Sequence, residues 1–173
     1  MDELKDFIRN IPDFPQPGIL FRDITTLLKQ PTVLQRTMEL FTKTCQEKNL
    51  KPDFVAGIES RGFIFAPSLA CQLNAGFIPI RKPGKLPGPV HSQSYGLEYG
   101  HDTLQIHQDA VSPGSKVLIV DDLLATGGTA EATYQLITSC GAEVIGFLFL
   151  IELSDLTGRT KLNNVPVHSL ITY

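Results

Sequence analysis

The residues best suited to chemistry lie in one segment, 117–130, which reads VLIVDDLLATGGTA. The four apolar residues 117–120 predict a buried strand, and Asp121 and Asp122 follow at its carboxyl end. A Gly-Gly pair at 127–128 then leads into a predicted helix. Ligands of open α/β sheets bind at the carboxyl ends of the strands, so this segment indicates a ligand site.

The loop after this strand can hold a phosphate group without Lys or Arg. Glycines let backbone N–H groups approach an anion closely, and a helix N-terminus carries roughly half a positive charge. Thr129 adds a hydroxyl donor. The two aspartates would repel the same phosphate, so we expect them to face a group with donors, such as the hydroxyls of a sugar. The alternative is a tight strand-to-helix turn that the aspartates merely cap.

Two other phosphate-binding motifs do not fit this segment. A Walker loop has Lys after its last glycine, whereas Gly128 is followed by Thr129 and Ala130. A dinucleotide-binding fingerprint has the pattern GxGxxG after a first strand, and the sequence contains no such pattern. The segment therefore favours a phosphate and a ribose diol bound side by side.

Composition excludes several classes of protein. The chain has 173 residues, of which 42% are apolar and 19% charged, enough apolar residues to form the core of one domain. Its net charge of -3 gives no broad basic surface for a polyanion, so we expect no nucleic acid as a partner. Cys45, Cys71 and Cys140 are odd in number and widely spaced, which favours reduced thiols in a cytoplasmic protein.

No segment of the sequence predicts membrane insertion. The longest nearly unbroken apolar stretch, 144–151, is far shorter than the roughly 18 residues that a spanning helix needs. The first residues, MDELKDFIRNI, carry acids where a secretory signal needs a basic region before an apolar run. We therefore expect a protein that is neither exported nor bound to a membrane.

Helices and strands are expected to alternate along the chain. Leu4, Phe7, Ile8 and Ile11 recur with helical spacing, and a second helix is expected after Pro31. Two further helices are expected near 63–73 and 129–139. Buried strands are expected at 54–58, 77–80, 117–120 and 144–151, and an antiparallel strand at 103–107. This order predicts an α/β fold with a mainly parallel sheet flanked by helices. Proline clusters at 12–17 and 79–89 predict two long functional loops.

Five motifs in order resemble the phosphoribosyltransferase family, and within it the branch that acts on adenine. They are FPQPGILFRDIT, GIESRGFIFAP, IRKPGKLPG, YGLEYG and VDDLLATGGT. The resemblance covers nearly the whole chain. It implies the type I fold of that family as a single domain, 1–173, with a small base-binding hood and N-terminal helix in residues 1–32 and a flexible lid loop in residues 82–103.

The resemblance also implies a reaction. The enzyme would transfer the 5-phosphoribosyl group from phosphoribosyl pyrophosphate to adenine, giving AMP and pyrophosphate in purine salvage. Mg²⁺ would be the cofactor, held mainly by substrate and water without a direct protein ligand. The protein would be a cytoplasmic homodimer.

The residue roles that the resemblance implies fall into four groups. The ribose hydroxyls would bind Asp121 and Asp122, and the 5′-phosphate would bind Ala125, Thr126, Gly127, Gly128 and Thr129. Pyrophosphate would bind Ser60, Arg61, Arg81, Lys85 and Tyr99. Lys82 is a further basic residue of this group, and the alternative for these cations, above all for Lys82, is a solvated basic face. Adenine would bind Phe14, Leu20, Arg22 and Leu123, although Phe14 could instead be a core aromatic. Glu98 would be the catalytic acid, unless it is only a surface glutamate on a mobile loop.

Two other functions remain possible at this point. A ligand-sensing regulator could keep the phosphoribosyl pyrophosphate site, but the first 27 or so residues are too few and too acidic for an added DNA-binding module. An enzyme for guanine, hypoxanthine or xanthine would typically carry an aspartate where this chain has Ala125. Both alternatives therefore fit the residues less well than an adenine enzyme.

Overall fold

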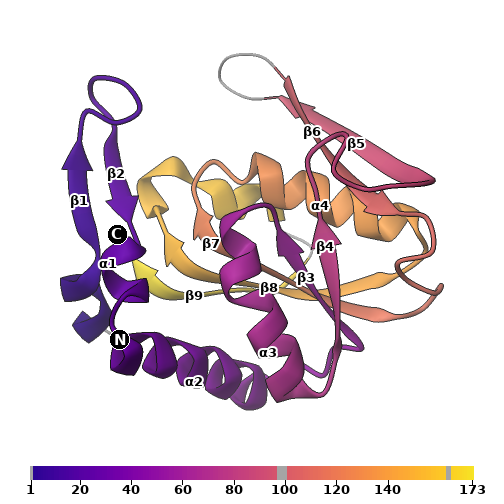
Figure 1. Ribbon diagram of the computed structural model, residues 1–173, viewed down its shortest axis with the longest axis horizontal. Coiled ribbons are helices and arrows are strands. Elements are labelled where there is room, and N and C mark those ends of the chain that lie inside the picture. Colours follow the sequence, from indigo (N-terminus) through magenta and orange to yellow (C-terminus); the bar gives the residue numbers. More distant parts are fainter. Residues whose placement is uncertain (1, 97–100, 163–164) are drawn as a thin grey trace.

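A five-stranded parallel sheet forms the centre of the molecule (Figure 1). The computed structural model describes residues 2–96, 101–162 and 165–173. The strands lie in the order β4, β3, β7, β8, β9, with bounds Gly76–Ile80, Phe54–Ile58, Lys116–Leu124, Glu143–Glu152 and Val167–Thr172. The predicted parallel α/β fold is confirmed. β9 was not predicted, because its polar residues His168 and Ser169 interrupt the apolar pattern.

Helices cover both faces of this sheet (Figure 1). On β7, Leu118 and Val120 are buried with α2 (Pro31–Glu47) and α3 (Ala66–Leu73). Val117 and Ile119 point to the other face and are buried with α4 (Gly128–Ser139). Successive side chains of a strand point to opposite faces of the sheet. The continuous apolar run of β7 is therefore explained by burial of both faces.

α2 forms as the sequence predicts. Pro31 occupies its first turn, where a missing backbone N–H has no cost. Met38, Phe41 and Cys45 are buried on one stripe, and Phe41 packs edge-to-face on Phe65 with ring centroids 5.5 Å apart. The helix is therefore held by an apolar face that packs against the sheet and α3.

The N-terminal segment differs from the predicted helix over residues 4–11. A 3-10 helix, η1 (Asp2–Phe7), is followed by β1 (Arg9–Pro12), which pairs antiparallel with β2 (Leu20–Asp23). Ile11 lies opposite Phe21 in this ribbon, and Arg9 Nε donates to Asp23 at 2.9 Å. The helix prediction was wrong beyond Phe7 because pairing with a strand ten residues away overrides the local spacing. A short helix, α1 (Thr25–Leu28), completes the segment.

The segment predicted as a lid loop, 82–103, contains regular structure. β5 (Val90–Gly96) pairs antiparallel with β6 (His101–His107), which extends the predicted strand 103–107. Leu104 and Ile106 of β6 are buried in the cluster that includes α4. β5 was missed because its residues are mostly polar and only partly buried.

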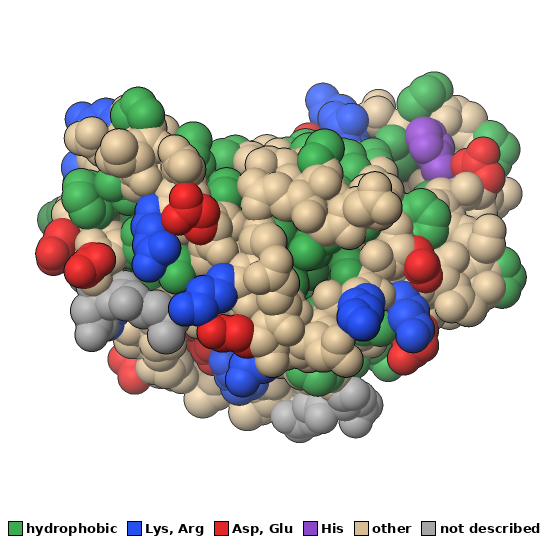
Figure 2. Space-filling model, turned by 90° about the horizontal axis from the view of Figure 1, so that it is seen from below, with side chains coloured by type: hydrophobic (Ala, Val, Ile, Leu, Met, Phe, Trp, Pro, Cys, Tyr) green, Lys and Arg blue, Asp and Glu red, His purple; other side chains and the backbone are tan. Residues whose placement is uncertain are grey.

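Acidic and basic side chains are interspersed on the face of the molecule shown in Figure 2. No broad basic patch covers that face. Within the described part of the chain, no helix is long and apolar enough to cross a membrane.

Phe41→Ala should destabilise the protein by about 3 to 5 kcal/mol, because it leaves a cavity beside Phe65 in a fully buried site. Chemical denaturation would measure this loss. The control is Lys43→Ala on the exposed face of the same helix. Lys43 pairs with the exposed Glu47, so this change should alter stability by less than about 0.5 kcal/mol. Equal losses in the two variants would contradict this account of how α2 is held.

Candidate functional site

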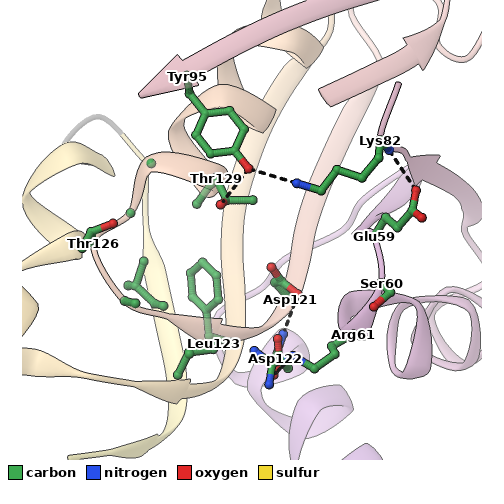
Figure 3. A pocket seen from close by; sticks show the side chains of 16 residues that line it. Glu59, Ser60, Arg61, Lys82, Tyr95, Asp121, Asp122, Leu123, Thr126 and Thr129 are labelled. Atoms are coloured by element: carbon green, nitrogen blue, oxygen red, sulfur yellow. Dashed lines mark hydrogen bonds and ion pairs between the residues drawn. The ribbon is translucent and has the colours of Figure 1, made fainter. Parts of the chain in front are cut away.

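Two adjacent aspartates lie at the end of β7 and line a cavity of about 360 Å³ (Figure 3). The strand runs on to Leu124 instead of ending at the predicted Val120, so both aspartates belong to it. Asp121 Oδ1 accepts the backbone N–H of Asp122 at 2.9 Å. Asp122 is only 3% exposed. The cavity wall thus contains two carboxyl groups fixed by a sheet strand.

A glycine loop follows the strand and lines the same cavity. Its residues are Ala125, Thr126, Gly127, Gly128 and Thr129. Gly127 adopts φ +81 at the N-cap of α4, a conformation that side chains other than glycine rarely take. The N-terminus of α4 therefore opens on the cavity and offers it backbone N–H groups and a positive dipole end. An anion can bind there, next to the two aspartates.

Arg61 and Ser60 reach the cavity from the turn after β3 (Figure 3). Arg61 begins η2 (Arg61–Ile64), and its Nε lies 3.0 Å from Asp122 Oδ2. A Cβ on Gly62 would lie 2.8 Å from the carbonyl oxygen of Val120, so only glycine lets this turn approach β7 so closely. The turn thus brings a positive charge against the acid pair.

The environment makes the two carboxyl groups harder to ionise. Burial and the neighbouring Asp122 carboxylate raise the pKa of Asp121 well above its ordinary value. Burial also raises the pKa of Asp122, and the Arg61 guanidinium opposes this rise. Asp122 Oδ2 accepts no hydrogen bond from the described residues, since its contact with Arg61 is an ion pair only. The charge of Arg61 therefore holds the buried Asp122 carboxylate at the cavity wall.

Lys82 and Tyr95 also line the cavity. Lys82 Nζ forms an ion pair with Asp102, and that carboxylate together with Tyr95 raises the pKa of Lys82 despite the opposing effect of burial. The Tyr95 hydroxyl lies 3.3 Å from Thr129 Oγ1 and 3.4 Å from Lys82 Nζ (Figure 3). β5 therefore contacts the glycine loop through Tyr95. The basic run IRKPGK pointed to Lys82, whereas nothing in the sequence distinguished Tyr95 from a packing residue.

The structure does not bring all the predicted cations to the cavity. Arg81 Nε lies 2.9 Å from Glu59 Oε2, and its guanidinium lies over the ring of Phe63. Neither Arg81 nor Lys85 is among the residues that line the cavity. The roles of Glu98 and Tyr99 remain predictions, since both residues lie outside the described part of the chain.

Of the four residues predicted to bind adenine, Leu123 lines the cavity. Phe14 and Leu20 are about half exposed, at 51% and 45%, and belong to the ribbon of β1 and β2 with its connecting turn. The Arg22 guanidinium stacks on the ring of Tyr173 at 3.8 Å from its centroid. The side chain of Arg22 is therefore directed to the C-terminal strand and not into the cavity.

The ribbon contributes one aromatic residue that the sequence analysis did not single out. Phe21 packs edge-to-face on Phe14 with centroids 5.1 Å apart, and Arg61 lies over its ring at 5.4 Å. Because Arg61 lines the cavity, Phe21 lies just behind this part of the cavity wall. Its place next to Leu20 in FPQPGILFRDIT was the available signal.

A parallel sheet whose central strand carries an acid pair near its carboxyl end, followed by a TGG loop at a helix start, is typical of a phosphoribosyltransferase. Residues 23–167 match the family model described as the phosphoribosyl transferase domain. The chain is 62% identical over 171 residues to the adenine phosphoribosyltransferase of Picosynechococcus sp., covering 99% of each chain.

Solved structures agree with the sequence relatives. The adenine phosphoribosyltransferase of Thermoanaerobacter pseudethanolicus is 48% identical, covers 99% of each chain and superposes with a TM-score of 0.96. The enzyme of Saccharomyces cerevisiae, solved with adenine and an imino-altritol bisphosphate, is 42% identical with a TM-score of 0.93, covering 98% of this chain and 97% of that one. The chain belongs to the adenine phosphoribosyltransferases, a family of pentosyltransferase enzymes.

Arg61→Gln should raise the pKa of Asp122, because it removes the positive charge that opposes the effect of burial. Carbon-detected NMR of the aspartate carboxyl groups over a pH series would show the acid-pair titration move to higher pH. Arg36→Gln is the control, since Arg36 is exposed on α2 and pairs with Glu39. An acid pair that titrates identically in both variants would show that Arg61 does not stabilise the charged form.

Proposed function

We propose that this chain transfers the phosphoribosyl group of phosphoribosyl pyrophosphate to adenine, and that the cavity beside Asp121 and Asp122 is the site of this reaction. The observation that carries the proposal is the close placement of two carboxyl groups and a helix-capping glycine loop in one cavity. A sugar diol and its 5′-phosphate need these two kinds of partner side by side.

The ribose and its phosphate would be held by groups of opposite character. The 2′ and 3′ hydroxyls would donate to Asp121 and Asp122, and the position of both aspartates in the cavity wall supports this role. The 5′-phosphate accepts from the backbone of 125–129 and from the hydroxyl of Thr129. Positive charge develops on the ribose ring as the bond to pyrophosphate breaks, and the carboxylates stabilise it.

The leaving pyrophosphate needs cations and donors at the other end of the cavity. Ser60 and Arg61 belong to this group, and the position of Lys82 in the cavity wall supports adding it. The roles of Arg81, Lys85 and Tyr99 rest on the family resemblance. Arg81 would have to leave Glu59 to contact pyrophosphate.

Adenine would lie at the mouth of the cavity, between Leu123 and the aromatic pair of the ribbon. Phe14 is the predicted stacking residue. The position of Phe21 against Arg61 and Phe14 supports a contact of Phe21 with adenine as well. Backbone groups of Leu20 would pair with N1 and the 6-amino group of adenine. A 6-oxopurine presents the reverse pattern and leaves buried groups unpaired, which gives selectivity. Arg22 would support the ribbon from its stacked position on Tyr173.

Magnesium fits the chemistry of this site. Asp121 and Asp122 place negative charge next to the expected ribose hydroxyls, which favours a Mg²⁺ ion that is held through substrate oxygens. The ion would be bound mainly by substrate oxygens and water, and it would neutralise charge on the leaving pyrophosphate. The resemblance also supports a cytoplasmic homodimer that acts in purine salvage, a single domain over 1–173, a hood over 1–32 and a lid within 82–103.

Purified protein with Mg²⁺ and phosphoribosyl pyrophosphate should release pyrophosphate with adenine and not with guanine, hypoxanthine or xanthine. A coupled pyrophosphate assay measures this for each purine. Turnover with a 6-oxopurine but not with adenine would overturn the specificity. No turnover with any purine, together with tight binding of phosphoribosyl pyrophosphate, would instead favour a sensor.

Glu98→Gln should lower kcat by about 10² to 10⁴ while the adenine dissociation constant stays near the wild-type value, because the amide cannot donate or accept the proton at N7. Steady-state kinetics and calorimetry measure the two quantities. Glu47→Gln on the exposed face of α2 is the matched control. Wild-type turnover in Glu98→Gln would remove Glu98 from the mechanism.

A further inference from the structure

The chain after β8 forms the outer wall of the glycine loop 125–129. It contains two 3-10 helices, η3 (Ser154–Leu156) and η4 (Gly158–Leu162). The backbone N–H of Leu153 donates to the carbonyl oxygen of Leu124 at 2.9 Å, one residue before the loop begins. None of these residues has a part in the reaction proposed above, yet their backbone lies directly against the loop.

Gly158 and the loop meet backbone to backbone. A Cβ on Gly158 would lie 2.1 Å from the carbonyl oxygen of Ala125 and 2.8 Å from the nitrogen of Gly127. Conversely, a Cβ on Gly127 would lie 2.4 Å from the carbonyl oxygen of Gly158. Contacts this short leave no room for a methyl group on either side, so any side chain at 158 must displace the loop or the wall.

The next residue fixes Gly158 relative to the sheet. Arg159 Nε donates to Glu152 Oε1 at 2.8 Å, and its Nη2 pairs with Glu152 Oε2. Arg159 Nη1 also donates to the carbonyl oxygen of Val167 at 2.6 Å. Arg159 therefore ties the wall to the ends of β8 and β9 at once.

Glu152 is well placed to anchor this wall. It is 7% exposed, lies opposite Leu124 in the β7–β8 register, and accepts a further hydrogen bond from Ser169 Oγ at 2.7 Å. The hydrogen bonds from Arg159 and Ser169 lower its pKa, so the carboxylate stays charged at neutral pH. A bidentate pair with a buried carboxylate holds its two segments in one geometry.

We propose that Gly158 and Arg159 are positioning residues, which hold the glycine loop in the shape that binds the 5′-phosphate of the substrate. The inference rests on the proposed function of that loop. A cradle of backbone N–H groups binds an anion only if the groups are already directed at it, so a wall that fixes Ala125 and Gly127 determines the affinity for phosphoribosyl pyrophosphate.

The test uses the full chain with Gly158→Ala, and Arg159→Met beside Arg159→Lys. We expect Gly158→Ala to raise the KM for phosphoribosyl pyrophosphate about tenfold or more, with a much smaller change in the KM for adenine. Arg159→Met should raise the same KM severalfold, and Arg159→Lys should restore part of the loss, since lysine keeps the charge. Gly114→Ala is the control for a glycine substitution, because a Cβ at Gly114 would meet no atom of the loop within 4 Å.

Hydrogen–deuterium exchange provides a readout that does not depend on activity. Amides of residues 125–129 should exchange about tenfold faster in Arg159→Met, while amides of α2 keep their wild-type rates. Unchanged loop exchange and an unchanged KM in Arg159→Met would overturn the proposal, even if Gly158→Ala fails to fold. A wild-type protein that does not turn over phosphoribosyl pyrophosphate would contradict the proposed function, whereas the exchange rates would still decide whether the wall positions the loop.

Discussion

The site depends on one electrostatic constraint, the placement of Asp121 and Asp122 side by side at the end of a central strand. Two neighbouring carboxyl groups in a partly buried place repel one another, and both have raised pKa values. Arg61 offsets part of this cost from the turn after β3, and that turn can approach only because residue 62 is glycine. The acid pair therefore explains why the separate segment after β3 carries a positive charge at position 61 and a glycine at position 62.

Carboxylates hold the two cations that line the cavity, and a third, Arg81, is held by Glu59 of the cavity wall. Arg61 pairs with Asp122, Lys82 with Asp102, and Arg81 with Glu59. An anionic ligand must compete with these partners, so the affinity for pyrophosphate depends on how easily each pair separates. This arrangement agrees with a net charge of -3 and with the mixed charges seen on the surface (Figure 2). The uncharged backbone of the glycine loop has no such competition, which suits it to a phosphate that stays on the substrate throughout the reaction.

The elements that could be predicted from the sequence are those whose buried apolar residues recur at regular intervals. α2, α4, β3, β7 and β8 follow from apolar runs and stripes, because burial in the two clusters on either side of the sheet imposes the period. β1, β5 and β9 were missed or misassigned, since their stability comes from pairing with another strand. The helical spacing of Leu4 and Ile8 reflects real burial, but strand pairing decides the conformation of Ile11.

The same distinction applies to the site. The acid pair and the glycine loop are contiguous in sequence and were predicted together, whereas the arrangement of the remaining residues depends on tertiary contacts that no local pattern encodes. Tyr95 meets Thr129 only because β5 packs on α4, and Phe21 meets Arg61 only through a contact between residues forty positions apart in the chain. Gly158 is thirty residues or so beyond the loop it contacts, and a lone glycine before an arginine has no recognisable pattern. Functional residues that lie together in one loop can be predicted from the sequence. The residues that hold this loop in shape can be identified only when the backbone contacts are known.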